Sequence, residues 1–252
     1  MARAELTLFA HIAARPDSEL DLAQASLLIA EDEYPGLDVA QYIERLDAFG
    51  AKARERLADM VKPGDPRAQT PARLQRVLAY VFRELGFHGN AVDYYDPKNS
   101  WLNDVIERRT GIPITLAVVL LEILQRAGVE AYGVSFPGHF LIRSPGPRGP
   151  VFADPFDGRI LDREDLRQLH GRVAGEPSDP DPRLLEPADK RQILVRMLSN
   201  LRGIWAARGD RERMRTTLER LEILQPSEEL RREIAALGGE TAPVPGKSRI
   251  FN

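Results

Sequence analysis

The sequence predicts an α+β fold, in which an N-terminal helical segment leads into a mixed core and a helical hairpin closes the chain. Apolar residues recur every three or four positions in the first half and again near the end, which is the spacing of amphipathic helices. Between residues 114 and 124 they occupy nearly every side, which predicts a fully buried helix. Short segments rich in β-branched and aromatic residues follow, and these predict a small antiparallel sheet.

Three helices are expected in the first 90 residues. SELDLAQASLLIAEDEYPG predicts a helix that stops near Pro35 and Gly36, and DVAQYIERLDAFGAKARERLADM predicts a second helix with one apolar face. Thr70 is a suitable cap and Pro71 a suitable first-turn residue for the third helix, whose apolar stripe ends at Leu85.

The core segment begins with a polar, aromatic loop, GFHGNAVDYYDPKNS, and a short helix, WLNDVIERR, entered from Ser100. Pro113 predicts the first turn of the buried helix and Gly128 its stop. The segments VEAYGVSF, HFLIRS and VFADPF are the predicted strands, and DREDLRQLHGRV is a short helix after them.

Residues 172–190 are dense in Pro, Asp and Gly and predict a linker. Two amphipathic helices follow with a Gly-Asp turn between them, which predicts an α-hairpin. The predicted division is an N-terminal helical segment, a core, a linker, a hairpin and an irregular tail, at residues 1–90, 91–171, 172–190, 191–238 and 239–252.

Composition narrows the function classes. The 252 residues carry a net charge of −3 with both signs interspersed, which argues against a nucleic-acid partner. Cysteine is absent, which excludes disulfides, thiolate zinc sites and a cysteine nucleophile. The N-terminus does not read as a signal peptide and the longest apolar segment is too short to span a bilayer, so a cytoplasmic protein without a membrane partner is expected.

The sequence predicts no metal and no cofactor. The four histidines, His11, His88, His139 and His170, form no HxH or HxxxH pair. His139 and Asp154 supply two ligands at most, whereas a metal site needs three or four. Neither a Gly-rich phosphate loop nor a dinucleotide fingerprint is present.

His139 and Asp154 are the strongest candidates for chemistry. Asp154 interrupts an apolar strand just before Pro155, where burial of a carboxylate is costly without a partner. A histidine one strand over is a natural partner, because the carboxylate would orient its ring and favour its charged form. The alternative without a chemical function is a structural histidine together with an aspartate that caps the turn DPFDG, and spacing alone leaves both interpretations open.

The chain resembles the SirB1 family over about residues 20–235. The resemblance is carried by GIPI, FPGHFL and DPFDG in that order, by LLIAEDEYPGLD, and by QILVRMLSNLRGIW. It implies a transglutaminase-like (cysteine-proteinase-like) core. It also implies that the C-terminal helices form a tetratricopeptide-like hairpin, although free-standing arrays of that kind need about three repeats.

In active members of this fold, the resemblance implies a cysteine at the start of a buried helix and a His and an Asp on adjacent strands. The His matches His139 and the Asp matches Asp154, while the cysteine position falls at Ile114 or Thr115, where no thiol is present. Thr115 is a weak substitute and its hydroxyl has an ordinary role in a first helical turn. Ser135 is a weaker candidate still.

Polar and aromatic residues before the buried helix are expected near the same cleft: Asn99, Asn103, Glu107, Arg108, Arg109, Tyr94 and Tyr95. Structural ion pairs are the favoured role for Glu107 and the two arginines, and the alternative is that they bind an acidic ligand or a chain terminus.

These observations favour a non-catalytic protein-interaction or regulatory protein that has lost its nucleophile, with an unidentified protein partner. The alternative is a hydrolase or acyl transferase. It would use the Thr115 hydroxyl or an activated water, with His139 as general base and Asp154 orienting it.

Overall fold

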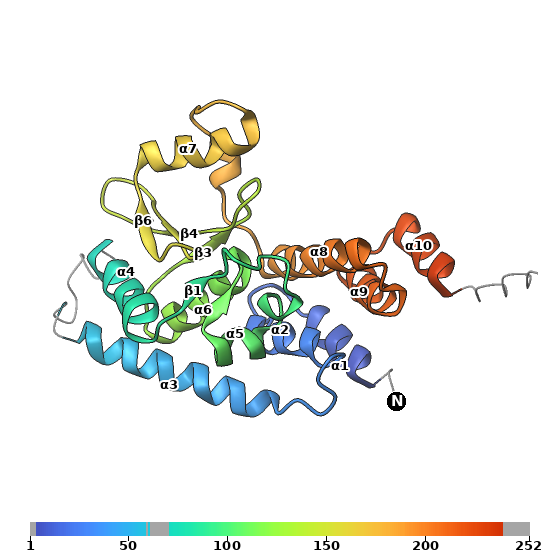
Figure 1. Ribbon diagram of the computed structural model, residues 1–252. Coiled ribbons are helices and arrows are strands. Elements are labelled where there is room, and N and C mark those ends of the chain that lie inside the picture. Colours follow the sequence, from blue (N-terminus) through green and yellow to red (C-terminus); the bar gives the residue numbers. More distant parts are fainter. Residues whose placement is uncertain (1–3, 59, 61–70, 239–252) are drawn as a thin grey trace, which may run out of the picture.

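The computed structural model describes residues 4–58, 60 and 71–238 (Figure 1). Its helical first part comprises α1 (Ala4–Ala13), α2 (Leu22–Ala30), α3 (Val39–Leu57), α4 (Pro71–Leu78) and the π-helical turn η2 (Ala79–Glu84). Asp21 and Asp38 cap α2 and α3 by accepting hydrogen bonds from the backbone N–H groups of Gln24 and Gln41. The predicted cap Thr70 lies outside the described residues.

Helix α2 ends at Ala30, earlier than the predicted stop near Pro35 and Gly36. The cause lies in the side chains that follow it. Asp32 pairs with Arg220, Glu33 pairs with Arg213, and the Tyr34 hydroxyl donates to Asp104 at 2.6 Å. These long-range contacts hold the segment in turns that a continued helix would break.

The buried helix is α6 (Pro113–Arg126), and it begins and ends where the sequence predicts. Pro113 occupies the first turn, and Gly128 follows the helix with a φ of 71°, a left-handed conformation that glycine adopts without strain. Before it lie β1 (His88–Gly89), the 3₁₀ turn η3 (Pro97–Asn99), α5 (Leu102–Arg108) and β2 (Thr110–Gly111), with β1 and β2 pairing in parallel.

The main sheet has four antiparallel strands in sequence order: β3 (Tyr132–Val134), β4 (Leu141–Ser144), β5 (Val151–Asp154) and β6 (Arg159–Leu161). Strand β6 was not predicted, because its three residues are too few to show an alternating pattern. Helix α6 contacts β3 and β4. Helix α7 (Arg163–Ala174) lies on the other side of the sheet from α6 (Figure 1), where its Leu166 and Leu169 pack against Phe152 and Leu161.

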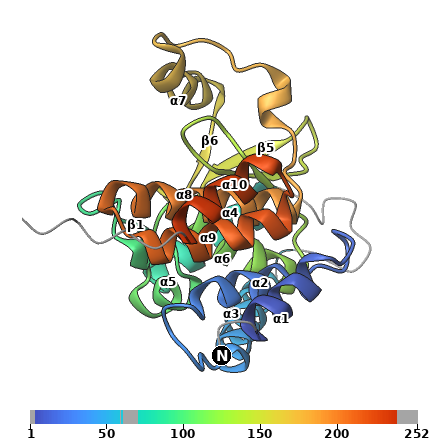
Figure 2. The same cartoon turned by 90° about the vertical axis from the view of Figure 1, so that its right-hand side faces the viewer.

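Three helices close the described chain: α8 (Lys190–Arg208), α9 (Arg211–Leu224) and α10 (Glu228–Gly238). They lie together on one side of the molecule and face the viewer in Figure 2. Helices α8 and α9 form the predicted hairpin around Gly209, and α10 was not predicted. A tetratricopeptide-like nature of the hairpin stays a prediction. The predicted irregular tail, 239–252, lies outside the described residues.

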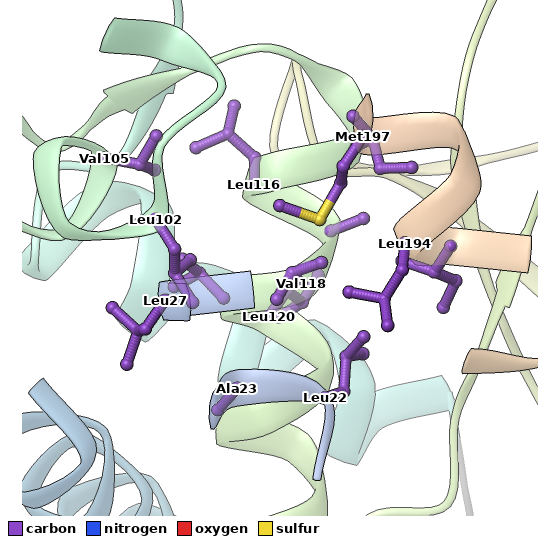
Figure 3. Packing of buried hydrophobic residues seen from close by; sticks show 14 of the residues in the cluster. Leu22, Ala23, Leu27, Leu102, Val105, Leu116, Val118, Leu120, Leu194 and Met197 are labelled. Carbon is purple, nitrogen blue, oxygen red and sulfur yellow. The ribbon is translucent and has the colours of Figure 1, made fainter. Parts of the chain in front are cut away.

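One hydrophobic cluster joins the N-terminal helices, α6 and the C-terminal hairpin. In Figure 3, Val118 and Leu120 of α6 lie in the middle of the cluster, with Leu27 of α2 and Leu102 of α5 on one side and Leu22 of α2 and Leu194 of α8 on the other. Met197 of α8 belongs to the same cluster and is fully buried. This cluster contains residues from three of the five predicted parts. The five-part division of the chain stays a prediction.

The predicted linker 172–190 carries structure of its own. It contains the end of α7 and the 3₁₀ turn η4 (Pro182–Leu185), and the Ala188 N–H donates to the Gly133 carbonyl of β3 at 2.8 Å. This bond covers part of the outer edge of the sheet before α8 begins. Among the helices of the described ranges, none combines the length and hydropathy that a bilayer crossing requires.

Candidate functional site

Strands β4 and β5 bring His139 and Asp154 together. Ile142 lies opposite Ala153, so extending this register by one residue places Leu141 opposite Asp154. His139 precedes Leu141 by two positions and is therefore diagonal to Asp154 on the same face. A tight turn fixes the start of the strand, since the His139 N–H donates to the Phe136 carbonyl at 3.0 Å.

The two side chains are in contact. His139 Nε2 lies 2.9 Å from Asp154 Oδ1, and the side chains are only 10% and 7% exposed. The contact has an ion-pair distance, but the ring N–H direction does not align with the carboxylate, so Nε2 has no hydrogen bond of good geometry within the described part of the chain. The Phe156 ring stands edge-on to the imidazole at 6.3 Å between centroids and limits access from that side.

Asp154 also caps the turn that follows it. Its Oδ1 accepts hydrogen bonds from the backbone N–H groups of Phe156 at 2.7 Å and Asp157 at 3.4 Å. The two interpretations that the sequence leaves open are therefore compatible, because one carboxylate holds the turn and contacts the histidine. The turn is anchored in addition by the Gly89 N–H, which donates to the Phe156 carbonyl at 3.2 Å.

The start of α6 offers no reactive side chain. Ile114 is 2% exposed and apolar. The Thr115 hydroxyl is fully buried and donates to the Asn99 carbonyl at 2.7 Å, while it accepts from the Ile112 N–H at 3.2 Å. The hydroxyl therefore already donates one hydrogen bond and accepts another, both with backbone groups. Its hydrogen bonds tie the first turn of α6 to the loop before α5.

The loop residues that the sequence places near the cleft have structural contacts. Asn99 is fully buried, and its side-chain amide donates to the carbonyls of Asp93 and Tyr94 at 2.7 and 3.2 Å. Asn103 is 4% exposed, and its Oδ1 finds no hydrogen-bond donor among the described residues. Tyr95 is 72% exposed and its ring packs against that of Tyr94.

The charged residues of α5 are engaged in pairs. Glu107 pairs with Arg45 of α3, and Arg108 pairs with Asp96 at 3.0 Å. Arg109 lies over the rings of Phe49 and Phe87, and burial lowers the pKa of its guanidinium. The ion pairs of Glu107 and Arg108 and the stacking of Arg109 correspond to the structural role, and Nη1 of Arg109 has no hydrogen-bond partner among the described residues.

Sequence reasoning missed Phe156, which faces the histidine, and Arg196 of α8, whose charge acts on Tyr94. The Phe156 ring lies 6.3 Å from that of Tyr94, so it bridges the histidine and the aromatic loop. Burial raises the pKa of the Tyr94 phenol, and the positive charge of Arg196 in α8 opposes this rise. The order of residues along β4 and β5 could have suggested Phe156, but Arg196 approaches only through the packing of α8.

Neither Ser135 nor a metal adds to this site as described. Ser135 is exposed, and His139 has no hydrogen bond to a serine or threonine hydroxyl within the described ranges. In the same ranges, no group of three or more His, Cys, Asp or Glu side chains is placed to hold a metal ion. The described residues provide a histidine in contact with a carboxylate but no side-chain nucleophile hydrogen-bonded to it.

Comparison with known families gives one match. A model of the transglutaminase-like superfamily matches residues 40–199, which include the start of α6, both site strands and the first half of α8. No solved structure was found to match the chain.

Several curated proteins are similar to this chain. A UPF0162 protein of Xylella fastidiosa is 39% identical over 229 residues, which cover 88% of this chain and 78% of the relative. A UPF0162 protein of Pseudomonas aeruginosa is 32% identical over 75% of this chain and 66% of its own length. F-box only protein 21 of Mus musculus is 29% identical over 54% of this chain, but over only 22% of that protein.

Proposed function

We propose that this chain, which belongs to the transglutaminase-like superfamily and to the UPF0162 proteins, is a non-catalytic, SirB1-like member that acts by binding a protein partner. One observation carries the proposal. The 252 residues include no cysteine, and the hydroxyl at the start of α6 that could replace a thiol already has a donor and an acceptor in the backbone. The site therefore keeps a base and its orienting acid without a side chain for them to activate.

The retained pair has a use in binding. A histidine that is 10% exposed beside a 7% exposed carboxylate offers a polar anchor at a surface otherwise formed by Phe156 and the aromatic loop. Buried polar groups that need a partner give specificity, because a ligand that does not satisfy them binds poorly. The tetratricopeptide-like hairpin and the N-terminal helices extend this surface in our proposal.

A turnover assay tests the absence of catalysis. The purified chain is incubated with glutamine-containing peptides and amine acceptors, and separately with amide and ester substrates. We expect no product above the rate without protein. Turnover that disappears in His139→Ala, and that persists in a matched surface variant such as His88→Ala, would contradict the proposal.

Installation of a thiol tests the ancestry of the site. We expect that Ile114→Cys or Thr115→Cys creates a thiol whose pKa lies below the ordinary value of about 8.5, because a helix N-terminus favours thiolate and the proposed ancestry of the site puts the thiol beside His139. Ultraviolet absorbance of the thiolate measures this directly, since the chain has no other cysteine. His139→Gln in the same background should raise the thiol pKa. An unperturbed thiol at both positions would show that the match to the cysteine position is wrong.

A hydrolase is the second candidate, and a specific observation favours it. Asp154 contacts Nε2 of His139, so Nδ1 is the nitrogen that remains to act as a base on a water molecule. In this alternative Asp154 orients the ring, and the Thr115 hydroxyl or an activated water attacks. The turnover assay separates the two candidates, because only the hydrolase loses an activity in His139→Ala.

A further inference from the structure

A cavity of about 440 Å³ lies beside the turn that carries His139. One wall is formed by Ser135 and by the segment 183–188, which descends from α7 past the edge of the sheet (Figure 1). The other wall is the face of α8 that carries Gln192, Arg196 and Ser199. Its size is within the range of pockets that bind small molecules or short peptide segments.

The cavity and the histidine adjoin the same turn, residues 135–139. Ser135 comes directly before Phe136, whose carbonyl accepts the His139 N–H at 3.0 Å. Arg196 is linked to the same neighbourhood, since its charge acts on the Tyr94 phenol and Tyr94 packs near Phe156, which faces the His139 ring. His139, Asp154 and Phe156 are not part of the cavity lining, so the cavity is connected to the histidine only through this turn.

Arg196 is the cation of this cavity that lacks a counter-charge. It is half-buried and forms no ion pair or hydrogen bond with a described residue. The other charged groups of the wall are occupied, because Glu186 pairs with Arg143 at 2.9 Å and Arg183 pairs with Asp181 at 2.5 Å. A partly buried guanidinium without a partner is costly, and a bound carboxylate offsets that cost through two parallel hydrogen bonds.

The polar groups beside Arg196 suit a singly charged anion. Ser135 has a hydroxyl without a hydrogen bond to a described residue, and Gln192 uses its Oε1 to accept the Asp189 N–H, so its amide N–H₂ remains a donor. Ser199 is committed, since its hydroxyl donates to the Val195 carbonyl at 2.7 Å. One guanidinium with two neutral donors matches a carboxylate better than a doubly charged phosphate.

We propose that this cavity binds a carboxylate of a peptide, with Arg196 as its ion-pair partner and Ser135 and Gln192 as additional hydrogen-bond donors. The inference rests on the proposed function only in taking the bound molecule to be a protein. In this proposal Arg196, rather than Arg108 or Arg109, holds the acidic group or the chain terminus, because Arg108 is paired with Asp96 and Arg109 is stacked over the rings of Phe49 and Phe87.

Peptide pools test the proposal. The probes are acetylated tetrapeptides of random sequence with a free C-terminal carboxylate, the same pool with an amidated C-terminus, and an amidated pool with one glutamate in each peptide. Binding is followed by the amide chemical shifts of Ser135 and Ser199. We expect the free-carboxylate pool or the glutamate pool to bind more tightly than the neutral pool by about tenfold, and increasing salt to weaken this preference. Which acidic pool binds identifies the source of the carboxylate.

Matched variants locate the interaction. Ser199→Glu places a competing carboxylate one helical turn from Arg196, whereas Ser199→Gln has nearly the same size without the charge. We expect Ser199→Glu to abolish the preference for acidic peptides and Ser199→Gln to keep it. Arg196→Gln should abolish it too, with Arg191→Gln of the same helix as the control.

Two outcomes would overturn the proposal. One is equal binding of the acidic and neutral pools by the native chain, and the other is an unchanged preference in Ser199→Glu, which does not depend on Arg196→Gln being folded. Neither outcome bears on catalysis, and turnover by the native chain would refute the proposed function without altering these binding results. The two proposals therefore fail separately.

Discussion

Replacing Thr115 by valine tests whether its hydroxyl serves the fold. Valine has nearly the same shape as threonine, so the substitution removes the hydroxyl and leaves the packing of α6 in place. Two buried groups then lose their partner, the Asn99 carbonyl and the Ile112 N–H. An unsatisfied buried group costs about 1–3 kcal/mol, so for two groups we expect the free energy of unfolding to fall by about 2–6 kcal/mol.

The matched control is Thr115→Ser, which keeps the hydroxyl and loses one methyl group at a cost of about 1 kcal/mol. Urea denaturation followed by circular dichroism measures both variants, and an unchanged m-value shows that the same surface is exposed on unfolding. If Thr115→Val were as stable as Thr115→Ser, the hydroxyl would have no structural role. The hydroxyl-dependent hydrolase would then regain its main support.

Three further predictions concern stability. Gly50→Ala should destabilise the fold by about 1–3 kcal/mol in urea denaturation, because the added Cβ would lie 2.2 Å from Arg126 Cβ where α3 crosses α6. The control, Gly203→Ala, adds its Cβ in open space and should stabilise the fold by about 0.5–1 kcal/mol; equal effects of the two substitutions would contradict the close crossing. Arg220→Met should cost about 1–3 kcal/mol by the same method, since it removes the ion pair with Asp32, whose side chain is 38% exposed and keeps some solvation; no loss would mean that the pair contributes nothing. Burial raises the pKa of Glu122 despite its pairing with Arg126, so the folded chain binds a proton more tightly than the unfolded chain and loses stability as the pH rises from about 4.5 through the folded pKa. Glu122→Gln should flatten this decrease in pH-dependent urea midpoints, and an identical pH profile in both proteins would refute the argument.

The helices were predictable where their signals are local. Helix α6 has an apolar run between Pro113 and Gly128, and both of its ends lie where these residues indicate. The predicted end of α2 was wrong, because Asp32 pairs with Arg220, about 190 positions away, and Tyr34 donates to Asp104, 70 positions away. The π-helical turn η2 was also missed, since its one extra residue per turn leaves no mark in an apolar stripe of this length.

In the candidate site, too, the contacts between residues close in sequence were predictable and the long-range contacts were not. His139 and Asp154 belong to neighbouring strands of one hairpin, and hairpin register follows from alternation and turn length, so their contact could be anticipated. The partners of Thr115 and the position of Arg196 could not. They depend on how the loop before α5 and the face of α8 pack against the core, and periodicity reports which residues are buried but not what they meet.

The contact between α1 and α9 has a consequence for how the chain acquires its structure. The guanidinium of Arg220 lies over the ring of Phe9, 5.4 Å from its centroid, so a residue near one end of the described chain packs against a residue near the other end. Contacts of such sequence separation form late, because the intervening loop must close first. During synthesis the part of α1 that packs on α9 therefore stays uncovered until α9 has left the ribosome, whereas α2 can already pack against α3, α5 and α6.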